Sequence, residues 1–251
     1  ALQVERPAPA GAPAAEADQL TYRDVKMRST RRLIADNLAL SMREMAQSSM
    51  TTSFDAGELL RIRKLFKESK NEAYRGITIS DMVMYAVVHS VLKYPFFNAH
   101  YFGDQYMIRQ FDHVHLGIAV DTENGLMVPT VFNADLLRLH ELSARVKELA
   151  AACRSGSISP SLLTGASITV SNMGPAGAET VTPIVNPPQV AIVGICRTDY
   201  RVRPDGKGGF SIYQAMPLAL TIDHRVSDGT PAGAFMADIC YNLEHFTELL
   251  A

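Results

Sequence analysis

A histidine flanked by two acids stands near the C-terminus, in the stretch TIDHRVSDG at 221–229, directly after a run of apolar residues. Histidine is the residue type whose unperturbed pKa, about 6.5, lies nearest to neutral pH, and it commonly serves as a general base or a metal ligand. By residue type alone it is a candidate general base, a candidate metal ligand, or a turn histidine bonded to its neighbours. Asp228 also has a structural interpretation, because it lies where a side chain caps the helix predicted from Thr230.

A second polar stretch, SITVSNMG at 167–174, precedes this histidine by about fifty residues. A predicted strand ends here with a hydroxyl and an amide, Ser171 and Asn172, and the glycine that follows lets the backbone approach a ligand closely. Ser-Asn before glycine is also an ordinary turn signal. The local sequence therefore leaves two interpretations open, a substrate-binding edge or a turn.

The histidines do not form a metal-binding pattern. A zinc site needs three or more ligands at compatible spacing. His113 and His115 lie on one face of a predicted strand, but the histidines at 89, 100, 140 and 245 complete no such set with them. We therefore expect no metal site.

The composition is that of a folded domain without a preference for polyanions. Of 251 residues, 47% are hydrophobic and 20% charged, and 24 basic against 26 acidic residues give a net charge of -2. Nucleic-acid binding would require a basic patch, which the interleaved charges lack. No apolar run approaches the roughly 20 residues of a membrane span, and no secretion signal opens the chain. We expect a reducing compartment, with Cys153, Cys196 and Cys240 as buried, reduced thiols.

Two parts are predicted along the chain. Residues 1–20 are rich in Ala, Pro, Gly and Glu, which predicts a linker or arm of a modular protein, or a disordered tail. Residues 21–251 alternate helical and extended patterns, which predicts one mixed α/β domain. Helices are predicted from Ser29 and from Ser80, each as an N-cap, from Thr230, and over 55–67 and 139–156; strands are predicted at 113–121, 126–132, 167–173, 189–196 and 216–223.

These stretches resemble one protein family, in the family's own order. DHRVSDG resembles the DHRxxDG signature of the acyltransferase catalytic domain of 2-oxo acid dehydrogenase complexes, the dihydrolipoamide acyltransferase or E2 core. The resemblance covers about residues 25–251 and implies a chloramphenicol acetyltransferase-like α/β fold, a mixed sheet with flanking helices that forms trimers. Its further matches are RSTRRLIADNL to the first helix, VHLGIAVDTENGLMVPTV to the central strand pair, GSISPSLLTGASITVSNMG to a helix-to-strand passage and TPIVNPPQVAIVGI to the stretch before the final strands.

The resemblance implies transfer of an acyl group between coenzyme A and a dihydrolipoyl group carried on a separate lipoyl domain. Coenzyme A is then a substrate whose contact residues are not identified, and no metal takes part. His224 corresponds to the general base that deprotonates the attacking thiol, and Ser171 to the serine that stabilises the oxyanion. Asp228, the third site residue, corresponds to an acid that supports the turn by pairing with Arg31 in a largely buried ion pair.

Neighbouring residues are expected to support these groups. Asn172 is interpreted as shaping the loop after Ser171, and Asp223 and Arg225 as bracing the turn of His224. Thr230-Pro231 stands where succinyl-specific members tend to carry charged residues. This disfavours a succinyl donor and leaves acetyl and branched-chain acyl groups open.

The resemblance also implies an assembly. The family's site lies between the subunits of a homotrimer, where the histidine of one chain meets the serine of its neighbour, and the trimers build a cubic or dodecahedral core. Phe246, Leu249 and Leu250 are candidates for contacts in that core, or they complete the buried face of the last helix. Expected partners are lipoyl domains, and E1 and E3 subunits bound through upstream domains absent from these residues. The expected compartment is the bacterial cytoplasm or the mitochondrial matrix, without a nucleic-acid or membrane partner.

Two other functions fit the same residues. A non-catalytic scaffold would keep the fold and the assembly after losing the chemistry, but retention of both His224 and Ser171 argues against it. A free-standing enzyme that acylates a small hydroxyl compound is the second alternative. The Ala/Pro-rich arm and the NPPQ stretch at 186–189 favour the complex core instead.

Overall fold

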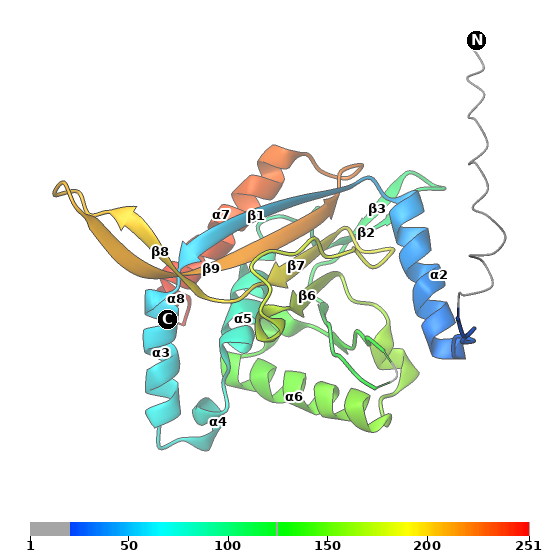
Figure 1. Cartoon of the computed structure of the whole chain (residues 1–251), viewed down its shortest axis with the longest axis horizontal. Coiled ribbons are helices and arrows are strands. Elements are labelled where there is room, and N and C mark those ends of the chain that lie inside the picture. The colour runs from blue at the N-terminus through cyan, green and yellow to red at the C-terminus, as the bar shows by residue number, and fades with distance from the viewer. Residues whose placement is uncertain (1–20, 124, 251) are drawn as a thin grey trace, which may run out of the picture.

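A central seven-stranded sheet organises the protein, in a computed structural model that describes residues 21–123 and 125–250 (Figure 1). The predicted linker at 1–20 lies outside the described residues. The helices are α2 Ser29–Glu44, α3 Gly57–Glu68, α4 Glu72–Arg75, α5 Ile79–Val91, α6 Leu139–Ser155, α7 Gly229–Glu244 and α8 Phe246–Leu249. The strands are β1 Gln47–Asp55, β2 Ala99–Phe102, β3 Met107–Gln110, β4 Leu116–Ile118, β5 Thr130–Val131, β6 Ile168–Asn172, β7 Ala191–Ile195, β8 Asp199–Pro204 and β9 Phe210–Asp223.

The directions of the strands determine at which end of the sheet His224 and Ser171 lie. The sheet has the order β1-β9-β7-β6-β4-β5, and β8 pairs with the first part of β9. Strand β9 is antiparallel to β1 and β7, whereas β6 is parallel to β7 and β4. The carboxyl end of β9 therefore lies at one end of the sheet, beside α2, and the carboxyl ends of β6 and β7 lie at the other (Figure 1).

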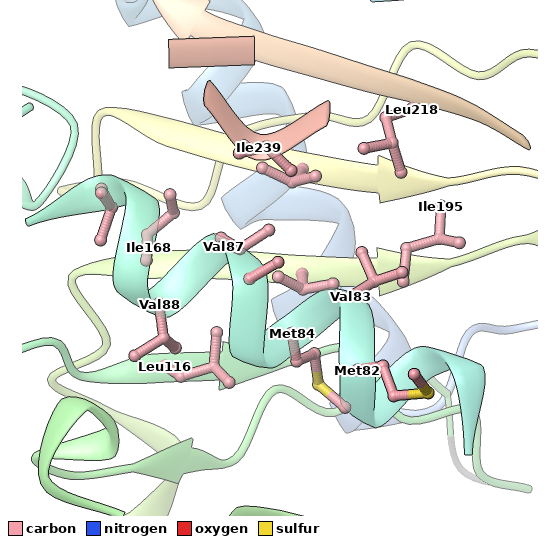
Figure 2. Packing of buried hydrophobic residues seen from close by; sticks show 14 of the residues in the cluster. Met82, Val83, Met84, Val87, Val88, Leu116, Ile168, Ile195, Leu218 and Ile239 are labelled. Carbon is pink, nitrogen blue, oxygen red and sulfur yellow. The ribbon is translucent and has the colours of Figure 1, made fainter. Parts of the chain in front are cut away.

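Helix α5 packs into the centre of the core. Its apolar residues face the sheet and α7, and Val83, Val87 and Val88 are fully buried (Figure 2). Each such side chain contributes about 1.5–3 kcal/mol relative to an exposed one. The N-cap is Thr78, not the predicted Ser80, because Thr78 forms a capping box with Asp81.

The predicted helices at 139–156 and from Thr230 are confirmed, and their predicted apolar faces are buried. Helix α6 ends at Gly156, which adopts the left-handed conformation that favours glycine. Helix α7 begins at Gly229 with Asp228 at the N-cap position, but the Asp228 carboxylate accepts no capping hydrogen bond. Phe246 is fully buried in the chain's own core, so the alternative that it contacts another trimer is wrong; Leu250 remains 41% exposed.

Several elements were not predicted from the sequence. Strand β1 has the sequence QSSMTTSFD, whose polar residues give no apolar alternation, and its place comes from pairing with the whole second half of β9. The β2–β3 hairpin and β8 were not predicted either. Ser29 is the first residue of α2 and not its cap, since Arg28 occupies the N-cap position.

The three cysteines are free thiols, as predicted. Cys153 and Cys196 are buried and Cys240 is partly buried. Burial raises the pKa of all three thiols, that of Cys240 to about 12. They remain protonated near neutral pH and pack as small apolar groups.

Candidate active site

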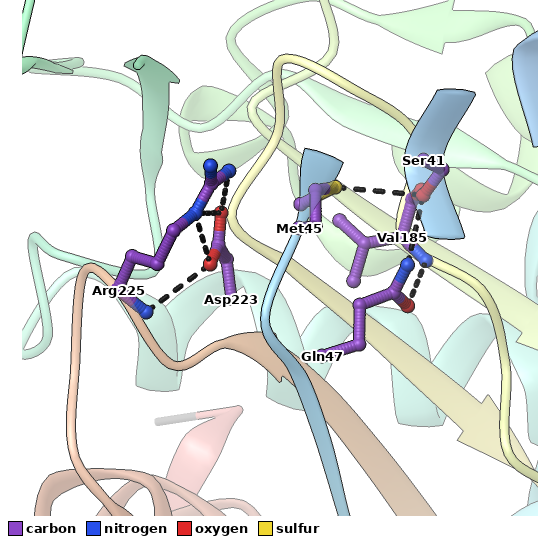
Figure 3. Close-up of polar contacts among 6 residues, drawn as sticks. All are labelled: Ser41, Met45, Gln47, Val185, Asp223 and Arg225. Atoms are coloured by element: carbon purple, nitrogen blue, oxygen red, sulfur yellow. Dashed lines mark hydrogen bonds and ion pairs between the residues drawn. The ribbon is translucent and has the colours of Figure 1, made fainter. Parts of the chain in front are cut away.

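Asp223 and Arg225 brace the turn that bears His224, as predicted, through an ion pair in which Asp223 is buried and Arg225 is partly exposed. Asp223 is fully buried at the end of β9, and the Arg225 guanidinium donates to both of its carboxylate oxygens at 2.6–3.1 Å (Figure 3). The backbone N–H of Arg225 also donates to Asp223 Oδ1, and the guanidinium lies 4.8 Å from the ring centroid of Tyr101. Replacing Arg225 would leave the buried Asp223 carboxylate without its counter-ion, which would destabilise the turn.

His224 itself is anchored by its backbone, and its ring is accessible. Its N–H donates to the Ala46 carbonyl at 2.9 Å, while its side chain is 44% exposed. The ring atom Nδ1 lies 3.7 Å from Asp228 Oδ1, which is an ion-pair distance when the ring is protonated and too long for a hydrogen bond. The other ring nitrogen, Nε2, has no hydrogen-bond partner in the described part of the chain, so it is free to meet a substrate.

The predicted ion pair between Asp228 and Arg31 is not formed within the chain. The Asp228 side chain is 86% exposed, and its ion-pair partner among the described residues is His224. Arg31 lies on exposed α2 and lines a cavity instead. The prediction of a largely buried intrachain pair is therefore wrong, because α2 does not cover the start of α7.

Helix α2 is fixed beside the histidine turn through polar contacts with the 180–189 segment. Ser41 Oγ donates to the Val185 carbonyl at 2.5 Å, and the Gln47 side chain bonds both Ser41 Oγ and the Val185 N–H (Figure 3). A cavity of about 620 Å³ next to the turn is lined by Asp223 and Arg225. A second, of about 600 Å³, runs under α2, and both are lined by Leu40, Pro187, Pro188 and Gln189. These volumes are in the range of ligand-binding pockets.

Ser171 lies at the opposite end of the sheet with its hydroxyl unengaged. It is half-buried near the end of β6 and is paired with Gly194 of β7, which is paired in turn with Ala219 of β9. A Cβ at Gly194 would lie 2.7 Å from Val181 Cγ2, so glycine lets the Val181 segment pack beside Ser171. The Ser171 side chain has no hydrogen-bond partner within residues 21–123 and 125–250.

One chain does not bring His224 and Ser171 together. Ser171 is level with Ala219 of β9, and His224 follows five residues later, roughly 17 Å further along the strand at the usual rise of a β-strand. Across the sheet, Ser171 and His224 are also two strand spacings apart, because β7 lies between β6 and β9. A site that uses both side chains therefore needs two copies of the chain.

Three other histidines, His100, His113 and His115, have structural hydrogen-bond partners. His113 Nδ1 bonds Asp135 Oδ2 at 2.8 Å, His115 Nδ1 accepts from a backbone N–H, and His100 Nε2 lies 2.7 Å from the Ala166 carbonyl. Burial lowers the pKa of His100 and His115. The pKa of Asp135 is lowered although burial acts against it, because His113 and a backbone N–H donate to its carboxylate. Within the described ranges, no group of three or more His, Cys, Asp or Glu residues is arranged to hold a metal.

Two residues of the site were not identified from the sequence. Tyr101 stacks on Arg225 from a hairpin that no pattern predicted. Ser80 was interpreted as a helix cap, but its hydroxyl accepts a hydrogen bond from Asn172 Nδ2 at 2.5 Å. No local signal identifies either contact, since both join segments far apart in the sequence.

The sequence matches the family described as 2-oxoacid dehydrogenases acyltransferase (catalytic domain) over residues 19–251. A relative, the dihydrolipoyllysine-residue acetyltransferase component of the acetoin cleaving system of Bacillus subtilis, is 34% identical over 90% of this chain. The corresponding component of the pyruvate dehydrogenase complex of Bacillus subtilis is 33% identical over 89% of it. The matches cover 56% and 50% of these relatives, so the chain spans about half of their length.

Solved structures agree with the fold. Azotobacter vinelandii dihydrolipoamide acetyltransferase superimposes with a TM-score of 0.87 at 30% identity, covering 97% of this chain and all of that one. The cubic core of the pyruvate dehydrogenase multienzyme complex gives the same values. A chloramphenicol acetyltransferase, with a TM-score of 0.52, 16% identity and coverage of 89% and 97%, shares the fold alone. The predicted chloramphenicol acetyltransferase-like fold is confirmed.

Proposed function

Since this chain belongs to the family of 2-oxoacid dehydrogenase acyltransferase catalytic domains, we propose that it transfers an acyl group between coenzyme A and the dihydrolipoyl group of a lipoyl domain. A thiol of one substrate attacks the thioester carbonyl of the other, a new carbon–sulfur bond forms and the old one breaks. The relatives named above are acetyltransferases, which supports acetyl as the acyl group. Both carriers are substrates, and the reaction needs no acyl-enzyme.

His224 is the proposed general base. A thiol with a pKa of about 8.5 is mostly protonated at neutral pH, so its proton must leave as sulfur attacks. The accessible ring, with Nε2 free and Nδ1 turned toward Asp228, can take this proton and return it to the departing thiolate. The reaction can run in either direction because the same imidazole serves both thiols.

Ser171 is the proposed donor to the developing oxyanion, and Asp228 the residue that supports the imidazole. In the Azotobacter vinelandii acetyltransferase, a serine, a histidine and an asparagine have been investigated for their role in the catalytic mechanism, and the last two stand four residues apart. His224 and Asp228 have that spacing, with aspartate in place of asparagine. The free hydroxyl of Ser171 can donate to a carbonyl oxygen that gains charge, an interaction that strengthens in the transition state.

A homotrimer is the proposed catalytic unit, with His224 of one chain facing Ser171 of the next. The two groups lie at opposite ends of the sheet, so a head-to-tail arrangement that closes as a ring gives each interface one complete site. The projecting β8–β9 hairpin supports this (Figure 1). One of its faces carries four exposed apolar side chains, Tyr200, Val202, Phe210 and Ile212, at 63–76% exposure. Such a surface indicates a partner.

A larger core is proposed as the setting of the trimer. A cubic core is the assembly named for one structural neighbour, and relatives belong to pyruvate dehydrogenase complexes of bacteria and mitochondria. Lipoyl domains, E1 and E3 are then the partners, in the bacterial cytoplasm or the mitochondrial matrix. Among the described helices, none is long and apolar enough to cross a bilayer.

The observation that supports this function most directly is an accessible His224 on a turn braced by the ion pair of Arg225 with buried Asp223. The test is transfer to free dihydrolipoamide from acetyl-, propionyl- and isovaleryl-coenzyme A, with the solution mass measured in parallel. His224→Ala should reduce transfer to background and leave the mass unchanged, whereas His140→Ala on α6 should transfer normally. Full turnover by His224→Ala would remove the base assignment, and an assembled wild-type chain that transfers no acyl group would favour the scaffold alternative.

A further inference from the structure

We infer that Ser80 is a positioning residue for Ser171 and acts through Asn172, an inference that rests on the proposed oxyanion role of Ser171. Asn172 is the last residue of β6 and follows Ser171 directly. Its Nδ2 donates to Ser80 Oγ at 2.5 Å across 92 residues of sequence. Ser80 lies in the first turn of α5, so this bond ties the end of the strand to a core helix.

The Asn172 amide also fixes the turn that follows. Its Oδ1 accepts from the Gly174 N–H at 2.9 Å, while the Met173 N–H donates to the Ile195 carbonyl of β7 at 2.9 Å. One side chain therefore bridges α5 and the loop after β6. The amide orientation follows from these contacts, because only the oxygen can accept from Gly174.

The first turn of α5, which contains Ser80, is held by further hydrogen bonds. Asp81, 2% exposed, closes the capping box by accepting from the Thr78 N–H at 2.7 Å. Ser143 of α6 donates to Asp81 Oδ2 at 2.8 Å, and Lys147 Nζ lies 3.7 Å from the same oxygen. Two helices thus hold the first turn of α5, where Ser80 accepts the hydrogen bond from Asn172.

Ser171 needs such support because the sheet ends beside it. The pairing of β6 with β7 stops at Asn172 and Ile195, and the Ser171 hydroxyl has no protein partner in the described residues to fix its direction. A displacement of about 1 Å at a catalytic group can lower a rate by about 10²-fold. The bond from Asn172 to Ser80 limits displacement of the strand end that bears the oxyanion donor.

Steady-state kinetics of the assembled chain test this role. Ser80→Ala should lower kcat about tenfold with KM within about twofold, because the oxyanion bond strengthens only in the transition state. Ser80→Thr keeps the hydroxyl and should restore kcat. In a Ser171→Ala background, Ser80→Ala should have no further effect, because the residue that it positions is already lost.

The controls separate the inference from the proposed function. Ser159→Ala removes an exposed hydroxyl bonded only to Ser161 and should leave kcat unchanged. If Ser171→Ala does not lower kcat, the oxyanion role fails. If it does, but Ser80→Ala keeps wild-type kcat, or lowers kcat equally with and without Ser171, then Ser80 does not position this serine.

Discussion

At the scale of single residues, the groups that hold the backbone differ from the side chains proposed to meet the substrate. Asp223 and Arg225 neutralise each other, one of them fully buried, and this fixes the backbone of the turn. His224, between them, keeps an accessible ring because its own contact to the body is made by its N–H. Ser171 is held in a similar way, because strand pairing fixes its backbone while its hydroxyl has no hydrogen-bond partner in the described residues.

Ser171→Ala should lower kcat by about 10²–10³, on the order of 3–4 kcal/mol, with little change in KM, because it removes the proposed oxyanion donor. Steady-state rates with acetyl-coenzyme A and dihydrolipoamide measure this. Ser167→Ala is not a suitable control, since its hydroxyl is buried and bonded to Asn98; Ser161→Ala is exposed and matched in chemistry. A loss confined to KM would make Ser171 a substrate-binding group instead.

At the scale of elements, the β8–β9 hairpin has two unlike faces. Side chains alternate along a strand and directly paired residues share a face, so Tyr200, Val202 and Ile212 form an apolar face and Arg201 and Arg203 a polar one. The polar face is used within the chain, where Arg203 pairs with Asp55 at 2.8 Å. The apolar face is open, which is the reason to expect another copy against it.

Ile212→Asp should dissociate the proposed trimer without unfolding the chain, because Ile212 is 72% exposed in the single chain and a charge there opposes only an intermolecular contact. Sedimentation velocity should show a shift to monomers, and turnover should fall with it, although His224 and Ser171 are both present. Ser211→Asp adds the same charge to the opposite face of the strand and should stay trimeric. An Ile212→Asp variant that keeps the trimer mass would exclude this face from the interface.

At the scale of the whole molecule, burial in the folded chain favours the neutral form of several histidines. Burial is the main cause that lowers the pKa of His89, His100 and His115. The unfolded chain binds protons at these positions below a pH of about 6.5, whereas the folded chain binds fewer. The free energy of unfolding is therefore highest above that pH and falls as the solution is acidified toward the lowered folded-state pKa values.

His100→Gln should make the free energy of unfolding less sensitive to pH below about 6.5, because burial lowers the pKa of His100 in the folded chain. Glutamine does not titrate and can still donate to the Ala166 carbonyl, which His100 Nε2 reaches at 2.7 Å. The slope removed should be at most about 1.4 kcal/mol per pH unit, the value for one proton. Urea unfolding at several pH values gives this slope, and an identical slope in wild type and variant would contradict the assignment of the loss to His100.

The sequence alone determined the elements whose residues carry a local pattern. The helical spacing of Leu139, Leu142 and Leu149 before Gly156 predicted α6, and apolar runs predicted β6, β7 and the second half of β9. The bracing of the DHRVSDG turn by Asp223 and Arg225 could be predicted because that contact spans only two residues. Local patterns work here because the physical interactions that they reflect are themselves local.

Tertiary structure decided what depends on contacts between distant segments. Strand β1 exists because β9 offers it a complete edge, and Ser80 meets Asn172 because α5 starts where β6 ends. The separation of His224 from Ser171 follows from opposite strand directions, which no motif encodes. Pairing register and strand direction depend on the whole sheet, so only the folded chain fixes which functional groups lie apart and which lie together.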